Sequence, residues 1–116
     1  MAFRFENLQV WQRAMDLDDQ INLLTKNFPK DELYLLTSQI KRAADSVVLN
    51  IAEGSTGQTK AIFKLFLSYS MRSAIEVVSC LFIAKRRNYI SDEHFKALYA
   101  DYESLVKMLT SLKNSI

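Results

Sequence analysis

The sequence of 116 residues is long enough for one domain with its own hydrophobic core, so we expect residues 1–116 to form a single domain. Apolar residues make up 49% and charged residues 24% of the chain, an ordinary globular balance, and the net charge of +2 is too small to identify a partner. The chain has no run of about 18 apolar residues and no apolar signal-peptide core near its start. We therefore expect a cytoplasmic protein without a membrane segment.

Four segments place apolar residues alternately three and four positions apart, the pattern of a helix with one buried side. They cover residues 10–28, 33–54, 63–84 and 95–116. The chain contains only 2 glycines and 1 proline, which favours long helices with few turns. The predicted fold class is therefore all-α, as an antiparallel up-and-down four-helix bundle.

Short polar breaks separate the four segments. Pro29 suits the start of the second helix, and Gly54 can close its end. Ser91 is the predicted N-cap of the fourth helix, and Asp92 and Glu93 suit the positive end of its dipole. Loops this short predict that consecutive helices lie side by side in opposite directions.

A polar stripe runs along the second predicted helix, beside its apolar side rather than opposite to it. At 100° per residue the stripe covers about 80° of arc. It consists of Gln39, Arg42, Ser46, Asn50 and Glu53. Such side chains need partners, since burying a polar group unpaired costs about 1–3 kcal/mol. The stripe therefore predicts a specific contact between helices.

Three residues of the stripe have specific predicted roles. Asn50 also falls on the apolar seam, where an asparagine commonly fixes helix register or oligomer state. Arg42 and Glu53 are predicted to make buried, hydrogen-bonded ionic contacts, with Glu76 of the third segment as the partner of Arg42. A ligand-binding pocket at Arg42, Asn50 and Glu53 is the alternative interpretation.

The first and third segments carry more apolar residues than one buried side needs. The additional residues are Leu8, Trp11, Met15, Ile62, Phe66, Met71, Ile75, Val78 and Phe82. A small bundle cannot surround its own helix, so this surplus predicts self-association. A monomer with an apolar groove for a helix of another protein is the alternative.

The residues needed for metal or nucleophilic catalysis are missing from the sequence. Glu53 and Glu76 are inward candidates, but His94 is the only histidine and lacks the Glu-x-x-His spacing of bundle metal sites. The only cysteine, Cys80, lies in an apolar run and is interpreted as a buried thiol. Residues 54–60 lack the spacing of a phosphate-binding loop. We therefore expect no enzymatic activity, no metal and no cofactor.

Positive charge is concentrated in the third segment. Residues 58–87 contain a single acid and six cations: Lys60, Lys64, Arg72, Lys85, Arg86 and Arg87. Cations favour the C-terminal end of a helix, so a solvated helix end is one interpretation of residues 85–87. The other is a site for nucleic-acid phosphates, which a symmetric oligomer would repeat.

The order and spacing of several short motifs resemble one family, the four-helix bundle proteins encoded in intervening sequences of bacterial 23S ribosomal RNA genes. Residues 8–14 resemble its opening L-x-V-W-x-x-A, and residues 50–54 resemble its N-I-A-E-G signature. The residues that carry the resemblance include Trp11, Gln39, Arg42, Ser46, Asn50, Glu53, Gly54, Ser73 and Glu76. Val48 and Arg72 stand where the family frequently has proline and glycine.

The resemblance implies an up-and-down bundle that assembles as a ring-shaped homopentamer. It also implies kinship with the accessory proteins of diversity-generating retroelements, which are similar pentamers that bind nucleic acid and a reverse transcriptase. We predict a non-enzymatic oligomer that binds structured RNA or DNA through basic patches, as a scaffold or accessory factor. The alternative is a protein-interaction module that binds no nucleic acid.

Overall fold

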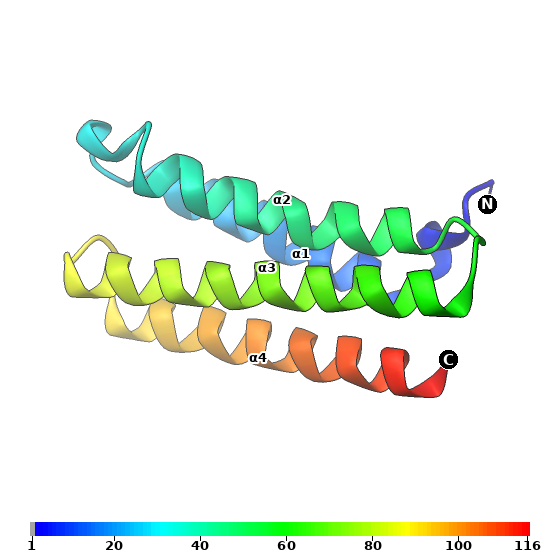
Figure 1. The fold of residues 1–116 in the computed structure, drawn as a ribbon. Helices are drawn as coiled ribbons and strands as arrows, with labels where there is room; N and C mark the ends of the chain where they lie inside the picture. Colours follow the sequence, from blue (N-terminus) through cyan, green and yellow to red (C-terminus); the bar gives the residue numbers. More distant parts are fainter. Residues whose placement is uncertain (1) are drawn as a thin grey trace.

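The computed structural model describes residues 2–116, and it has four long α-helices in this part of the chain (Figure 1). They are α1 (Gln9–Thr25), α2 (Leu36–Gly54), α3 (Lys60–Arg86) and α4 (Asp92–Ser115), with two short 3-10 helices, η1 (Arg4–Asn7) and η2 (Lys30–Glu32). No β-strand occurs between residues 2 and 116. The prediction of an all-α fold with four helices is confirmed.

The start of α2 differs from the prediction. The chain forms η2 directly after Pro29, and α2 begins only at Leu36. Leu33, which the periodicity placed on the buried side, is 51% exposed. The physical reason lies at Leu35, whose φ and ψ of −118° and −107° are far from helical values. This residue separates η2 from α2, so the two cannot form one continuous helix. Proline therefore starts a 3-10 turn here, not the long helix.

Helices α2 and α3 lie side by side along their length (Figure 1). Gln39 near the start of α2 donates a hydrogen bond to Glu76 of α3, whereas Gly54 at the end of α2 meets Phe66 near the start of α3. The start of α2 therefore contacts the later part of α3, and the end of α2 contacts the early part of α3. Figure 1 also shows α4 returning toward the end of the bundle where α3 begins, so both chain termini lie at that end.

The hydrophobic core lies between the four helices and uses residues from each predicted seam. Its fully buried members include Leu17, Ile21, Ile40, Ile51, Leu67, Val77, Leu81, Leu98, Leu105 and Leu109. Burying a side chain of this kind contributes roughly 1.5–3 kcal/mol, so the seams supply the main stabilisation. One polar residue joins them: Ser70 is completely buried, and its hydroxyl donates to the carbonyl oxygen of Val47 at 2.8 Å.

Helix α3 is long and apolar enough, by length and composition alone, to meet the criterion for a membrane-spanning helix. The prediction from apolar run length did not anticipate this. In the structure α3 packs along both α2 and α4, and its residues Leu67, Val77 and Leu81 are inaccessible to solvent. In its most apolar stretch 33% is buried, so the buried side of a bundle helix accounts for part of this apolar character.

Two carboxyl groups face each other between α1 and α2. Partial burial, a hydrogen bond with Asp45 and the charges of Asp45 and Asp19 raise the pKa of Asp18 to about 7, while Lys41 opposes the shift. The same two carboxyl groups affect the buried phenol of Tyr102: burial and the charges of Asp18 and Asp45 raise its pKa as well. The ionised form of Asp18 is therefore disfavoured in the folded protein.

Replacing Asp18 with asparagine is expected to stabilise the protein at pH 8 by about 1 kcal/mol, a value reduced because solvent screens a partly exposed carboxyl. A raised pKa means that the folded state holds the proton more tightly, so the native protein loses stability as the pH rises from about 4 through about 7. Urea unfolding at pH 8 and pH 4 measures the difference, which should vanish at the lower pH. Asp16→Asn, at an exposed position of α1, is the control; an equal gain there would contradict the assignment.

Candidate interaction surfaces

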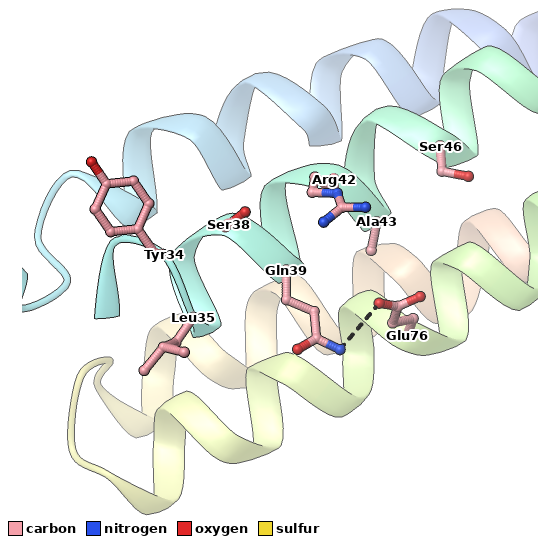
Figure 2. Close-up of a pocket in the computed structure, with 8 residues that line it drawn as sticks. All are labelled: Tyr34, Leu35, Ser38, Gln39, Arg42, Ala43, Ser46 and Glu76. Carbon is pink, nitrogen blue, oxygen red and sulfur yellow. Dashed lines mark hydrogen bonds between the residues drawn. The ribbon is translucent and has the colours of Figure 1, made fainter. Parts of the chain in front are cut away.

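A groove runs between α2 and α3 (Figure 2). One part has a volume of about 510 Å³ and is lined by Tyr34, Leu35, Ser38, Gln39, Arg42, Ala43, Ser46 and Glu76. The adjoining part, about 410 Å³, is lined by Arg42, Asp45, Ser46, Leu49, Asn50 and Glu53. The second part is lined by α2 residues alone, so the shared Arg42 and Ser46 carry the groove from the junction with α3 onto the outer surface of α2. We call it the α2–α3 groove.

Hydrogen bonds between small polar groups form the base of this groove. The hydroxyls of Ser46 and Ser73 lie 2.8 Å apart and join α2 to α3. The amide of Asn50 donates to the carbonyl and hydroxyl oxygens of Ser46, one turn earlier in the same helix. The amide of Gln39 donates to Glu76 at 3.4 Å. The structure thus brings Gln39, Ser46 and Asn50 of the polar stripe together at the junction with Ser73 and Glu76 of α3.

The predicted ionic contacts of Arg42 and Glu53 are wrong for the single chain. Both residues are exposed, and neither forms an ion pair within residues 2–116. They occupy the outer edge of the stripe, where the side chain clears α3, and Glu76 binds Gln39 instead. Asn50 is likewise half-buried at the edge of the seam, because Val47 and Gly54 are the residues of α2 that meet α3 there.

The α2–α3 groove is flanked by apolar side chains that the fold leaves uncovered. On α2, Leu35 is 64% and Leu49 59% exposed. Helical spacing places Phe66, Tyr69 and Ile83 of α3 on the side toward α2. Phe66 and Tyr69 form an aromatic pair, with ring centroids 5.5 Å apart. Tyr69 and Ile83 are more than one-third exposed. Apolar residues this exposed, beside satisfied polar groups, are typical of a protein interface.

Part of the predicted apolar surplus is covered by the chain itself. Leu8, Trp11 and Met15 are half-buried against the core, as are Met71 and Val78 on α3. The short helix η1 folds back so that Phe5 packs on Trp11, with ring centroids 4.9 Å apart. The chain itself therefore covers part of this surplus, and self-association stays a prediction. Ile62 and Phe66 are half-buried beside the α2–α3 groove, whereas Ile75 and Phe82 remain exposed.

Two of the six predicted phosphate-binding cations have partners within the chain. Arg87 lies 2.7 Å from the buried carboxylate of Glu32, which also accepts a hydrogen bond from Tyr89. The bonds from Tyr89 and Arg87 hold the pKa of Glu32 below its ordinary value. Lys85 lies over the ring of Phe95 and 4.0 Å from an aspartate of α4. Arg87 therefore ties the turn after α3 to the turn before α2.

The remaining four cations, Lys60, Lys64, Arg72 and Arg86, form no ion pair within residues 2–116. They span nearly the whole of α3, about 40 Å at 1.5 Å per residue. Helical spacing places Lys60, Lys64 and Arg86 toward α4 or toward solvent. Arg72 points to solvent one turn before Glu76, the only acid of α3, which binds Gln39. These four cations form what we call the α3–α4 basic face.

Helix α4 adds two cations to this face that the sequence analysis missed. Lys113 donates to the hydroxyl of Ser68 on α3 at 2.8 Å, and Lys96 is exposed one turn before Tyr99. They lie far from α3 in sequence, and only the pairing of α3 with α4 brings them close. Their helical position in the fourth segment would have indicated them once that pairing was known.

The structure also places the groups considered for catalysis. Cys80 is buried, and burial together with the charge of Glu76 raises the pKa of its thiol to about 11, so the thiol stays protonated at neutral pH. No group of three or more His, Cys, Asp or Glu side chains that could hold a metal ion occurs in residues 2–116. The hydroxyl groups at the base of the α2–α3 groove bind one another or backbone oxygens.

The sequence matches the model of one protein family, and the structure is similar to a solved structure. The sequence model of the 23S rRNA-intervening sequence protein family matches residues 6–111. A crystal structure from Bacteroides thetaiotaomicron, described as a protein with unknown function from the S23 ribosomal protein family, is similar with a TM-score of 0.83. It is 24% identical and covers 90% of this chain and 95% of its own, which shows a shared fold. A search of curated proteins gives no match.

Proposed function

Since this chain belongs to the family of 23S rRNA-intervening sequence proteins, we propose that it is a non-enzymatic, antiparallel bundle that binds structured nucleic acid. In this proposal it assembles as a ring-like homo-oligomer and acts as a scaffold or accessory factor in the cytoplasm. The basic residues of the α3–α4 basic face contact phosphates, and the α2–α3 groove forms the contact between copies. The single observation that carries the binding proposal is the set of four cations without ion pairs along α3.

Charge and spacing support phosphate binding by the α3–α4 basic face. A cation that already pairs with a carboxylate has little to gain from a phosphate, whereas Lys60, Lys64 and Arg86 are free to neutralise one each. Nucleic-acid affinity rises as such contacts release counterions. A ring would repeat the face in every copy, so several weak contacts would act on one polyanion together.

The first experiment is a titration of the protein against structured RNA, duplex DNA and single-stranded DNA at several salt concentrations. We expect binding that weakens steeply as salt rises. The triple variant Lys60→Ala, Lys64→Ala, Arg86→Ala should reduce the slope of log affinity against log salt by up to about three, since each phosphate contact contributes about 0.9.

The matched control removes three exposed cations from the α1 and α2 side of the molecule: Lys26, Lys30 and Lys41. It lowers the net charge by the same amount but leaves the α3–α4 basic face intact. We expect this control to bind with nearly the native salt slope. No binding at low salt, or an equal loss in both triple variants, would contradict the proposal.

A second candidate is a protein-interaction module that binds no nucleic acid. The exposed Leu35 and Leu49 in the α2–α3 groove favour it, because they suit an apolar helix as well as a second copy of this chain. A stoichiometric protein partner that stays bound after nuclease treatment, together with no binding in the titration, would favour this candidate over the first.

A further inference from the structure

An aromatic cluster lies exposed between α3 and α4, outside the α2–α3 groove. Phe82 of α3 is 52% exposed and Tyr99 of α4 is 38% exposed. The two rings are perpendicular with centroids 6.1 Å apart, and both pack on the buried Phe95. Phe95 therefore fixes the two exposed rings in position, while part of each stays open to solvent.

Two exposed cations lie close to this cluster. Arg86 lies one helical turn beyond Phe82, and Lys96 lies one turn before Tyr99. Three acids are also nearby: Asp92, which lies 4.0 Å from Lys85, the exposed Glu93 one turn before Lys96, and the exposed Glu103. The cluster also continues the α3–α4 basic face, which adds Lys60, Lys64, Arg72 and Lys113 along the same helices. Cations and acids are therefore balanced next to the rings, and the excess of cations along α3 and α4 as a whole is what favours an anionic partner.

We propose that this cluster binds unpaired nucleotides, whose bases stack on Phe82 and Tyr99 while their phosphates lie near Arg86 and Lys96. This inference rests on the nucleic-acid binding proposed above and names the part of the nucleic acid that is bound. A single strand or an RNA loop offers both an exposed base face and a phosphate. In a duplex the neighbouring pairs cover the base faces, so a duplex would use the cations but not the rings.

The test compares substitutions that remove a ring with substitutions that keep it. Phe82→Leu and Tyr99→Leu retain an apolar side chain against Phe95 but lose the stacking surface, whereas Phe82→Tyr and Tyr99→Phe retain it. The probe is a single-stranded oligothymidine of about 12 nucleotides, within the usual site size of such proteins, and the control is a duplex of equal length. Fluorescence anisotropy measures both affinities.

We expect each leucine variant to weaken single-strand binding about tenfold, which corresponds to one lost base-stacking contact, and to change duplex binding less than twofold. The variants that keep the ring should bind as the native protein does. A strand carrying 2-aminopurine gives a second measurement, because its fluorescence is quenched by stacking and the quenching should be lost with the ring. If Phe82→Leu fails to fold, the Tyr99 pair decides alone.

The outcomes separate this inference from the function on which it rests. No binding of any nucleic acid at low salt would overturn both. Salt-sensitive duplex binding, together with leucine variants that bind the single strand as tightly as the native protein does, would overturn the stacking inference and leave the phosphate contacts in place. Loss of single-strand affinity in the leucine variants, with rescue by Tyr99→Phe, supports it.

Discussion

Replacing Gly54 with alanine is expected to lower the free energy of unfolding by about 1–3 kcal/mol, the usual range for an overpacked site. Gly54 is buried at the end of α2, and a Cβ added there would lie 2.7 Å from the Cβ of Phe66 and 3.0 Å from the ring of Phe63. The Cβ of Phe66 is fixed to the backbone of α3, so no rotamer change relieves the clash. The two helices would have to separate.

Helix propensity works against this loss but does not cancel it. Alanine favours a helix interior by about 1 kcal/mol over glycine, and less at the last residue of a helix, where Gly54 lies. Urea unfolding at one fixed protein concentration measures the difference. Asp16→Ala is the matched control, because Asp16 is exposed on α1 without an ion pair, lies outside the α2–α3 groove, and surface substitutions usually change stability by less than about 0.5 kcal/mol. A Gly54→Ala protein as stable as the native one would contradict the packing argument.

The four helices could be predicted because their apolar spacing is regular and each seam is buried as expected. Leu17, Ile40, Leu67 and Leu105 are fully buried, one from each predicted segment. The errors fall where local geometry replaces periodicity. The start of α2 moved to Leu36 because a 3-10 turn and an irregular backbone follow the proline, and hydrophobic spacing does not report backbone angles.

The interaction surfaces could be predicted only in part. The sequence indicated a polar stripe that includes Ser46 and Asn50, and in the structure Ser46 contacts Ser73 and Asn50 in the α2–α3 groove. The predicted ion pairs of Arg42 and Glu53 do not form within residues 2–116, because a helical wheel gives an angle but not the depth at which a long side chain such as Arg42 ends. Likewise, positive charge on α3 was recognised, but only the fold shows that Arg87 pairs with Glu32, which precedes it by 55 residues.

Replacing Leu49 with glutamate is expected to shift the protein from oligomer to monomer. Leu49 lines the α2–α3 groove and is 59% exposed in the single chain, so the substitution leaves the core intact. If a second copy covers it, the change buries an unpaired carboxylate beside Glu53. The expected penalty of several kcal/mol would weaken association by more than a hundredfold, since about 1.4 kcal/mol is tenfold. Analytical ultracentrifugation of both proteins over a range of concentrations measures the shift.

Leu23→Glu is the matched control, because Leu23 on α1 is 61% exposed but lies outside the α2–α3 groove. It introduces the same charge and removes the same side chain, so it should keep the native oligomer. A native protein that sediments as a monomer, or equal dissociation of both variants, would contradict self-association through this groove. The Leu49→Glu monomer also separates assembly from binding: its α3–α4 basic face is unchanged, so it should still bind nucleic acid, but more weakly, because one polyanion no longer contacts several copies at once.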